Sequence, residues 1–127
     1  MKTILIADDE EDIRIVVRMR LDEHDYRLLE ASNGRDALAL ARSEHPDLLI
    51  LDSRMPGLTG QEVVQALQED GVTACIPVIM VTGKDDVPEL VALRQTGRIT
   101  LVAKPFSPRV LFDQIEHLLR NNCLHPP

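Results

Sequence analysis

The sequence predicts a doubly wound α/β domain in which a five-stranded parallel sheet lies between two layers of helices. Short apolar runs alternate with helix-like patterns five times along the 127 residues. One run, residues 48–51, has four consecutive apolar residues, which need cover on both faces, as in the centre of a parallel sheet. Helices between successive parallel strands require right-handed crossovers that cover both faces. We therefore expect a (βα)5 three-layer sandwich with the strand order 2-1-3-4-5.

The first two expected strands flank an amphipathic helix. Residues 4–7 are an apolar run of the length of a buried strand. The apolar residues that then recur at helical spacing are Ile13, Val16, Val17 and Leu21. A weaker strand pattern follows at residues 27–31. One strand, one helix and a second strand are therefore expected before residue 32.

The second helix is bounded by residues that start and stop helices. Asn33 and Gly34 open it, and Ala37 belongs to its apolar stripe. It is expected to stop before Pro46, because the residue preceding a proline avoids the helical conformation. Residues 48–51 follow directly and form the third and central strand.

The C-terminal half repeats the alternation after a loop rich in proline and glycine. Its expected elements are a helix carrying Val63, Val64 and Leu67, a strand at residues 77–81, a helix capped by Asp85 or Asp86 with Pro88 in its first turn, a strand at residues 99–103, and a last helix starting at Ser107 and Pro108 and burying Leu111, Ile115, Leu118 and Leu119. We expect one domain over residues 1–121 and a short tail at 122–127.

Composition excludes several classes of function. The formal net charge of −7 argues against direct nucleic acid binding, which needs clustered Lys and Arg. No apolar run approaches the roughly 20 residues of a membrane span. The two cysteines, Cys75 and Cys123, form no CxxC pair, so a cysteine metal site is not expected, and free thiols fit the cytoplasm.

Five polar side chains stand at the ends of the expected strands: Asp8, Asp9, Asp52, Thr82 and Lys104. Doubly wound sheets bind ligands outside the carboxyl ends of their strands, where the strand order reverses. In the order 2-1-3-4-5 that point lies between strands one and three, which end at the three aspartates. Clustered carboxylates repel one another, and a divalent cation relieves the repulsion. The sequence therefore predicts a site for a metal ion and a phosphoryl group.

Each of these residue types suits phosphoryl transfer. Asp52 follows the most buried strand, and a carboxylate held there can act as a nucleophile. Asp8 and Asp9 can hold Mg²⁺, which prefers carboxylates and water. Lys104 and Thr82 can donate to phosphoryl oxygens. A single residue of this kind after a strand is more often a turn or cap residue. Because such residues occur at the ends of four strands that meet at one edge of the sheet, we favour a common site.

The chain resembles the receiver domain of response regulators, the CheY-like family of two-component signalling with a flavodoxin-like fold. The matching motifs are ILIADDE, LLILDSRMPGLTG, VIMVTG and VAKPF. The resemblance implies that Asp52 accepts a phosphoryl group from a sensor histidine kinase or a phosphotransfer protein. It also implies that Mg²⁺ is held by Asp9, Asp52 and the backbone carbonyl of Arg54, with Asp8 acting mostly through water.

The resemblance further implies that Thr82 moves towards the phosphoryl group, that Lys104 pairs with it, and that the Lys104-Pro105 bond is cis. The surface of the fourth helix, fifth strand and fifth helix would then control a downstream protein or effector domain, and phosphorylation could produce a dimer. Leu101 stands where the family usually has an aromatic residue. We therefore expect the signal to pass through residues 83–90 rather than through side chain 101.

In this family the first helix also takes part in kinase docking. Arg14, Arg18 and Arg20 are expected mainly on the solvent side of that helix, where they could contribute to the choice of partner.

Two other functions remain open from the sequence. One is a pseudo-receiver that binds proteins without phosphorylation, which Leu101 permits. The other is an aspartate-nucleophile phosphohydrolase of the haloacid dehalogenase type, which needs a second Asp where this chain has Arg54. We expect no enzyme activity beyond the chain's own phosphorylation and dephosphorylation.

Overall fold

The computed structural model describes residues 2–22, 26–83 and 99–121 and places in them a parallel sheet with the predicted strand order, β2-β1-β3-β4-β5. The strands are β1 (Lys2–Ala7), β2 (Tyr26–Ala31), β3 (Leu48–Asp52), β4 (Val78–Thr82) and β5 (Ile99–Ala103). The helices are α1 (Glu11–Leu21), α2 (Gly34–Glu44), α3 (Gly60–Gln68) and α5 (Pro108–Asn121). The helix expected after Asp85 or Asp86 and the tail at 122–127 lie outside the described residues.

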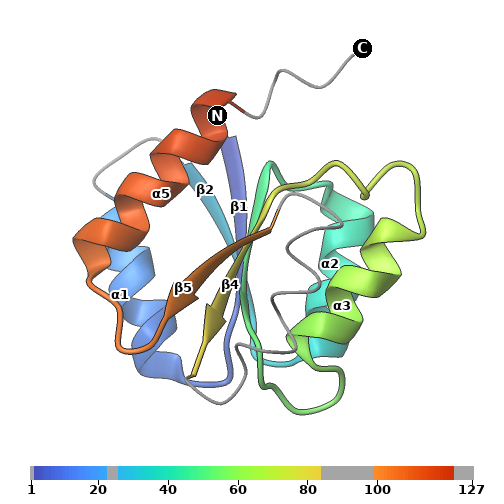
Figure 1. Ribbon diagram of the computed structural model, residues 1–127, viewed down its shortest axis with the longest axis horizontal. Coiled ribbons are helices and arrows are strands. Elements are labelled where there is room, and N and C mark those ends of the chain that lie inside the picture. Colours follow the sequence, from blue (N-terminus) through green and yellow to red (C-terminus); the bar gives the residue numbers. More distant parts are fainter. Residues whose placement is uncertain (1, 23–25, 84–98, 122–127) are drawn as a thin grey trace.

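The helices form one layer on each side of the sheet. Figure 1 shows α1 and α5 on one face, and α2 and α3 on the other. Residues of β3 alternate between the two faces: Leu48 and Ile50 pack in the cluster under α1 and α5, and Leu49 and Leu51 in the cluster under α2 and α3. All five β3 residues are buried. Because burying one such side chain contributes about 1.5–3 kcal/mol, the strand that carries Asp52 is firmly held.

The ends of the helices agree with the residues that predicted them. The side chain of Asn33 accepts a hydrogen bond from the backbone N–H of Asp36 and so caps α2. His45 ends that helix in a left-handed conformation, with φ of 47°, one residue before Pro46. At α3 the structure adds a capping box that the sequence analysis did not identify, formed by Thr59 and Glu62.

Strand pairing continues past the apolar runs. β3 includes Asp52, which pairs with Val81, whereas the apolar pattern stops at residue 51. β4 covers Val78–Thr82 instead of residues 77–81, and β1 begins at Lys2. The reason is that the backbone pairs regardless of side-chain polarity. Asp52 and Thr82 are therefore the last residues of β3 and β4.

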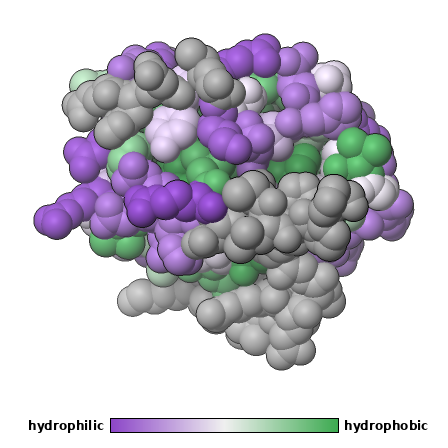
Figure 2. Space-filling model, turned by 90° about the horizontal axis from the view of Figure 1, so that it is seen from above, coloured by the Kyte–Doolittle hydropathy of each residue, from purple (hydrophilic) through white to green (hydrophobic). Residues whose placement is uncertain are grey.

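Figure 2 shows the molecule from the end at which the strands begin, opposite the end that carries Asp52 and Thr82. The coloured side chains there are mostly hydrophilic, with small hydrophobic areas between them. Of the helices in the described residues, none is both long and apolar enough to cross a membrane.

Candidate functional site

Four carboxylates converge at the carboxyl ends of β1 and β3. One oxygen from each of Asp8, Asp9, Glu10 and Asp52 lies within 4.8 Å of those of the others. Asp8 and Asp52 are only 2% and 5% exposed, whereas Asp9 and Glu10 are exposed. The predicted gathering of the three aspartates is therefore confirmed. Glu10 is an addition to the residues predicted from the strand ends.

The ammonium group of Lys104 lies among these carboxylates. Its Nζ atom donates to Oδ2 of Asp52 at 3.0 Å and to Oε1 of Glu10 at 3.2 Å, and lies 3.8 Å from Oδ2 of Asp8. The side chain of Lys104 is 25% exposed. The Lys104-Pro105 bond is cis, as the resemblance implied. Lys104 thus brings a partly desolvated positive charge to the acids.

Asp52 is held by backbone groups as well as by Lys104. The N–H of Arg54 donates to Oδ1 of Asp52 at 3.1 Å, and the N–H of Ser53 donates to the carbonyl of Val81 at 3.0 Å. The main chain of residue 54 therefore lies at the site, while its side chain is exposed.

Gly60 lets the first turn of α3 approach the main chain of Asp52 closely. Its N–H donates to the carbonyl of Ser53 at 3.2 Å. A Cβ atom at residue 60 would lie 2.5 Å from the carbonyl oxygen of Asp52 and 2.8 Å from the sulfur of Met80. No larger residue fits there without movement, so the glycine at the start of α3 contributes to the position of Asp52.

Thr82 is 1% exposed and ends β4, next to the strand that carries Asp52. Its carbonyl oxygen accepts a hydrogen bond from the backbone N–H of Lys104 at 2.7 Å. The ends of β4 and β5 are thereby joined, and all five residues predicted from strand ends lie along one edge of the sheet.

The electrostatics of the site reflect crowded negative charge. Burial, with a smaller contribution from the negative charge of Asp52, raises the pKa of Asp8 from its usual 3.8 to about 6. The hydrogen bond from the N–H of Glu10 acts in the opposite direction, because it stabilises the carboxylate. Burial alone would lower the pKa of Lys104, but its hydrogen bond to Asp52 and the charges of Asp52 and Asp8 hold that pKa above its usual value. Among the described residues, the ammonium group of Lys104 is therefore opposed to several carboxylates.

The donor set fits Mg²⁺. All four clustered side chains offer carboxylate oxygens, the hard ligands that this ion prefers, and two of the four side chains are exposed, which leaves room for the water molecules it retains. The charge of Asp52 adds to the effect of burial on the pKa of Asp8, so further positive charge at the site would stabilise the ionised cluster. A divalent cation would supply that charge.

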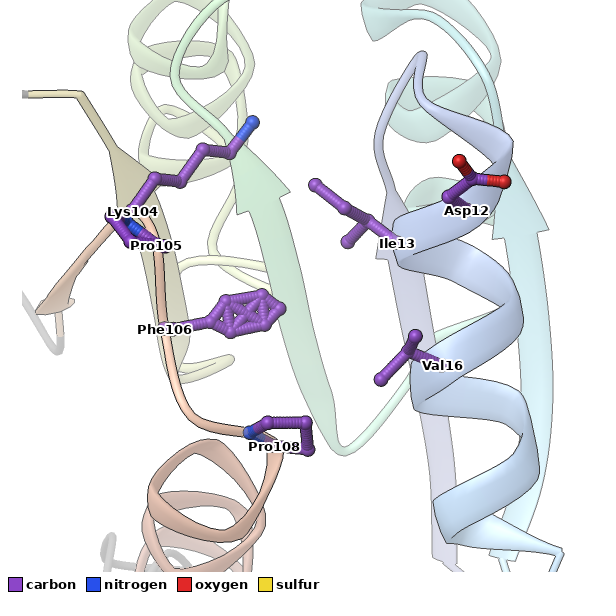
Figure 3. Close-up of a pocket in the computed structure, with 7 residues that line it drawn as sticks. All are labelled: Asp12, Ile13, Val16, Lys104, Pro105, Phe106 and Pro108. Atoms are coloured by element: carbon purple, nitrogen blue, oxygen red, sulfur yellow. The ribbon is translucent and has the colours of Figure 1, made fainter.

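An apolar pocket of about 440 Å³ borders the site between the start of α1 and the connection from β5 to α5. It is lined by Asp12, Ile13, Val16, Lys104, Pro105, Phe106 and Pro108. In Figure 3 Ile13 and Val16 project from α1 towards Phe106 and Pro108, and the Lys104 side chain extends along the upper edge. Val16 is 40% exposed, although the helical pattern placed it on a buried face.

Leu101 in β5 is partly buried and packs against the core cluster under α2 and α3. It acts there as an ordinary apolar residue. Most of residues 83–90, which are expected to carry the signal, lie outside the described part of the chain.

The chain matches the family described as response regulator receiver domain over residues 4–116. It is 39% identical over 119 residues to the phosphate regulon transcriptional regulatory protein PhoB of Pseudomonas aeruginosa, covering 94% of this chain and 52% of PhoB. It is 37% identical over 119 residues to protein PilH of the same organism, covering 94% of this chain and 98% of PilH. The chain thus spans about half the length of PhoB and of several other transcriptional regulators, but nearly all of PilH.

Solved structures give the same fold. The signal receiver domain of a signal transduction histidine kinase from Syntrophus aciditrophicus superposes with a TM-score of 0.87 at 27% identity, covering 99% of this chain and 96% of that one.

Proposed function

The chain belongs to the response regulator receiver domain family of two-component signalling, and we propose that it is a switch in which Asp52 is the phosphoacceptor. The observation that carries this proposal is the arrangement around Asp52. One oxygen of its buried carboxylate is bonded to Lys104 and the other to the N–H of Arg54, and the oxygens of three further carboxylates lie within 4.8 Å. A rigid nucleophile, a fixed cation and a metal-binding cluster are the components that phosphoryl transfer needs.

In the proposed reaction a carboxylate oxygen of Asp52 attacks the phosphorus of a phosphohistidine on the donor. The new O–P bond forms as the P–N bond breaks, and the histidine keeps the electron pair and takes up a proton. Lys104 then donates to a phosphoryl oxygen instead of to Asp52, and the hydroxyl of Thr82 donates to another. Mg²⁺, held by Asp9, Asp52 and the backbone carbonyl of Arg54, with Asp8 acting through water, would neutralise charge on the transferred group.

The two alternatives receive less support. A phosphohydrolase of the haloacid dehalogenase type needs an acid at position 54, where the side chain is an exposed arginine. A pseudo-receiver has no need of the Asp52–Lys104 hydrogen bond, which is present. We propose that this domain catalyses only its own phosphorylation and dephosphorylation.

We propose that the phosphodonor, a sensor histidine kinase or a phosphotransfer protein, docks over the apolar pocket between α1 and the β5–α5 connection. The donor must bring its phosphohistidine next to Asp52, and this pocket shares Lys104 with the site. Ile13, Val16 and Phe106 offer it an apolar surface beside the acids.

The output is proposed to pass through β5, α5 and the helix expected after residue 85 to a downstream protein or effector domain, with a phosphorylation-linked dimer as one form. We also propose a cytoplasmic location, because the thiol of Cys75 is free and exposed.

Incubation with acetyl phosphate and Mg²⁺, followed by intact mass measurement, tests the proposal. A stable mass increase of one phosphoryl group that hydroxylamine removes, and that Asp52→Asn abolishes, supports the switch. Continuous phosphate release would favour a phosphohydrolase. An unchanged mass would favour the pseudo-receiver.

A further inference from the structure

We propose that Arg14 is a positioning residue for the metal site, acting through the main chain of Asp8. The proposal rests on the proposed function, since it concerns the Mg²⁺ site of the same switch. Arg14 is in the first turns of α1, where the sequence analysis expected a solvent-facing side chain. Its side chain is instead only 17% exposed.

The guanidinium group of Arg14 joins two elements of the structure. Its Nη1 atom donates to the carbonyl oxygen of Asp8 at 2.6 Å, and its Nε atom lies 3.4 Å from Oε1 of Glu30 in β2. Glu30 pairs in register with Ile6 of β1, close to the end of that strand. Arg14 therefore braces the segment after β1 against the neighbouring strand.

All polar groups of the Asp8 main chain and one side-chain oxygen are bonded to fixed partners. The N–H of Asp8 donates to the carbonyl of Ala31 at 3.1 Å, its Oδ1 accepts from the N–H of Glu10 at 2.8 Å, and its carbonyl accepts from Arg14. Two of these bonds shape the turn locally or extend the sheet. The bond from Arg14 is the one that comes from a helix side chain.

The carbonyl that Arg14 binds belongs to the peptide between Asp8 and Asp9, so its direction sets the direction in which the Asp9 side chain leaves the main chain. Asp9 is exposed, and core packing does not fix it. We therefore expect the Arg14 hydrogen bond to control how well Asp9 and Asp52 can bind the same ion. Partners that orient metal ligands in this way typically change metal affinity by about 10-fold or more when removed.

The charge of Arg14 and its hydrogen bond to Asp8 predict opposite effects of its removal on Mg²⁺ affinity. Arg14 is a cation near a cation site, so by Coulomb repulsion alone its removal strengthens Mg²⁺ binding. If Arg14 positions Asp8 and Asp9, its removal weakens binding. Lysine separates the two effects further, because it keeps the charge but lacks the planar fork that reaches Asp8 and Glu30 together.

Arg18 provides a matched control on the same helix. Its Nε and Nη2 atoms bond the two oxygens of Glu30, each at 3.0 Å. Within the described part of the chain, Arg18 has no bond to Asp8. Arg18→Ala therefore removes a cation and a contact with Glu30 but leaves the Asp8 carbonyl bonded.

The experiment is isothermal titration of Mg²⁺ into the wild-type chain and into Arg14→Ala, Arg14→Lys and Arg18→Ala, with a urea unfolding curve for each. We expect Mg²⁺ affinity to fall about 10-fold in both Arg14 variants and to change less than about 2-fold in Arg18→Ala. If Arg14→Ala does not fold, Arg14→Lys decides the question.

Unchanged or tighter Mg²⁺ binding by the Arg14 variants would overturn the inference, as would an equal loss in Arg18→Ala. These results leave the proposed function intact, because the wild-type chain still binds the ion. A wild-type chain that does not bind Mg²⁺ would overturn both.

Discussion

The Nζ atom of Lys104 lies 3.0 Å from Oδ2 of Asp52, although the two residues are 52 positions apart in the sequence. The same nitrogen bonds Glu10 at 3.2 Å. Lys104 thus links the strand that carries the proposed phosphoacceptor to the acids after β1. In the proposed reaction the partners of this ammonium group change when Asp52 gains a phosphoryl group. Removal of the Lys104 charge is therefore expected to change the rate of phosphoryl uptake.

Lys104→Met keeps most of the side-chain length and removes the charge. A hydrogen bond to a charged group contributes about 1.5–3 kcal/mol, so we expect phosphoryl uptake from acetyl phosphate to slow about 10- to 100-fold. The measurement is the rate of mass increase at saturating Mg²⁺. Lys2→Met, which changes an exposed lysine at the start of β1, is the control and should keep the wild-type rate. An unchanged rate in Lys104→Met would show that its charge does not assist transfer.

The raised pKa of Asp8 predicts how the stability of the metal-free protein depends on pH. Its pKa is about 6 in the folded protein and 3.8 by default in the unfolded chain, so between these values the folded state binds more protons. The contribution of Asp8 to stability is therefore greatest below pH 4 and falls as the pH rises to about 6. The total loss is about 3 kcal/mol, at 1.36 kcal/mol for each pKa unit.

Asp8→Asn isolates this effect, because asparagine keeps an oxygen that can accept from the N–H of Glu10 but does not titrate. Urea unfolding of both proteins in EDTA, from pH 4 to pH 7, gives the difference in free energy of unfolding. We expect Asp8→Asn to become progressively more stable than wild type as the pH rises, and to bind Mg²⁺ more weakly. A constant difference over this pH range would contradict the prediction.

The strand order and most of the site were predictable because they depend on local patterns and one rule of topology. Apolar runs mark the strands, and polar residues at their ends meet at one edge, which placed Asp8, Asp52 and Lys104 together. The apolar pattern was weakest at β2, an edge strand whose residues are mostly half buried. The apolar pattern ends β3 one residue too early, before Asp52, because side-chain polarity does not report backbone pairing.

The contacts that the sequence did not reveal depend on long side chains and on the shape of one turn. Glu10 reaches Lys104 only because the segment after β1 turns back at Asp8. Helical spacing predicts a solvent-facing side chain for Arg14, because spacing indicates the face of the helix on which a residue lies but not a partner on a neighbouring strand. Val16 lies in the apolar stripe of α1, but this stripe is wider than the surface that the helix buries against the sheet. Val16 therefore lines the pocket instead of the core.

Gly60→Ala is expected to disturb the site through the main chain of Asp52. The added methyl would overlap the carbonyl of Asp52 and the sulfur of Met80, and overpacking of this kind costs about 1–3 kcal/mol. We also expect slower phosphoryl uptake, because α3 must move away from the acceptor. Gly71→Ala is the matched control: a methyl there meets nothing within 4 Å, and stability should change by less than about 0.5 kcal/mol. Urea unfolding and uptake assays on both variants provide the measurement.

Val16→Glu tests the docking proposal. It places a charge in the apolar pocket and should slow phosphoryl transfer from a donor protein at least about 10-fold, as loss of a central apolar contact does. Transfer from acetyl phosphate, which needs no docking surface, should be unchanged. Met19→Glu introduces the same charge on the same helix at a 65% exposed residue outside the pocket, and should leave both reactions unchanged. Equal slowing by the two variants would indicate a general charge effect.

Amide hydrogen exchange tests where the signal travels from Asp52. Thr82 is buried at the end of β4 and is joined to β5 by the hydrogen bond from Lys104, whereas Leu101 packs in the core and has no hydroxyl to exchange partners. We therefore expect a phosphate mimic with Mg²⁺ to change protection at residues 83–90 more than at Ile99–Ala103. Asp52→Asn, treated in the same way, should show no change at either segment. A larger change in protection in β5 than in residues 83–90 would contradict this prediction. It would indicate that the signal from Asp52 passes through Leu101, because repacking of this side chain would move its own strand.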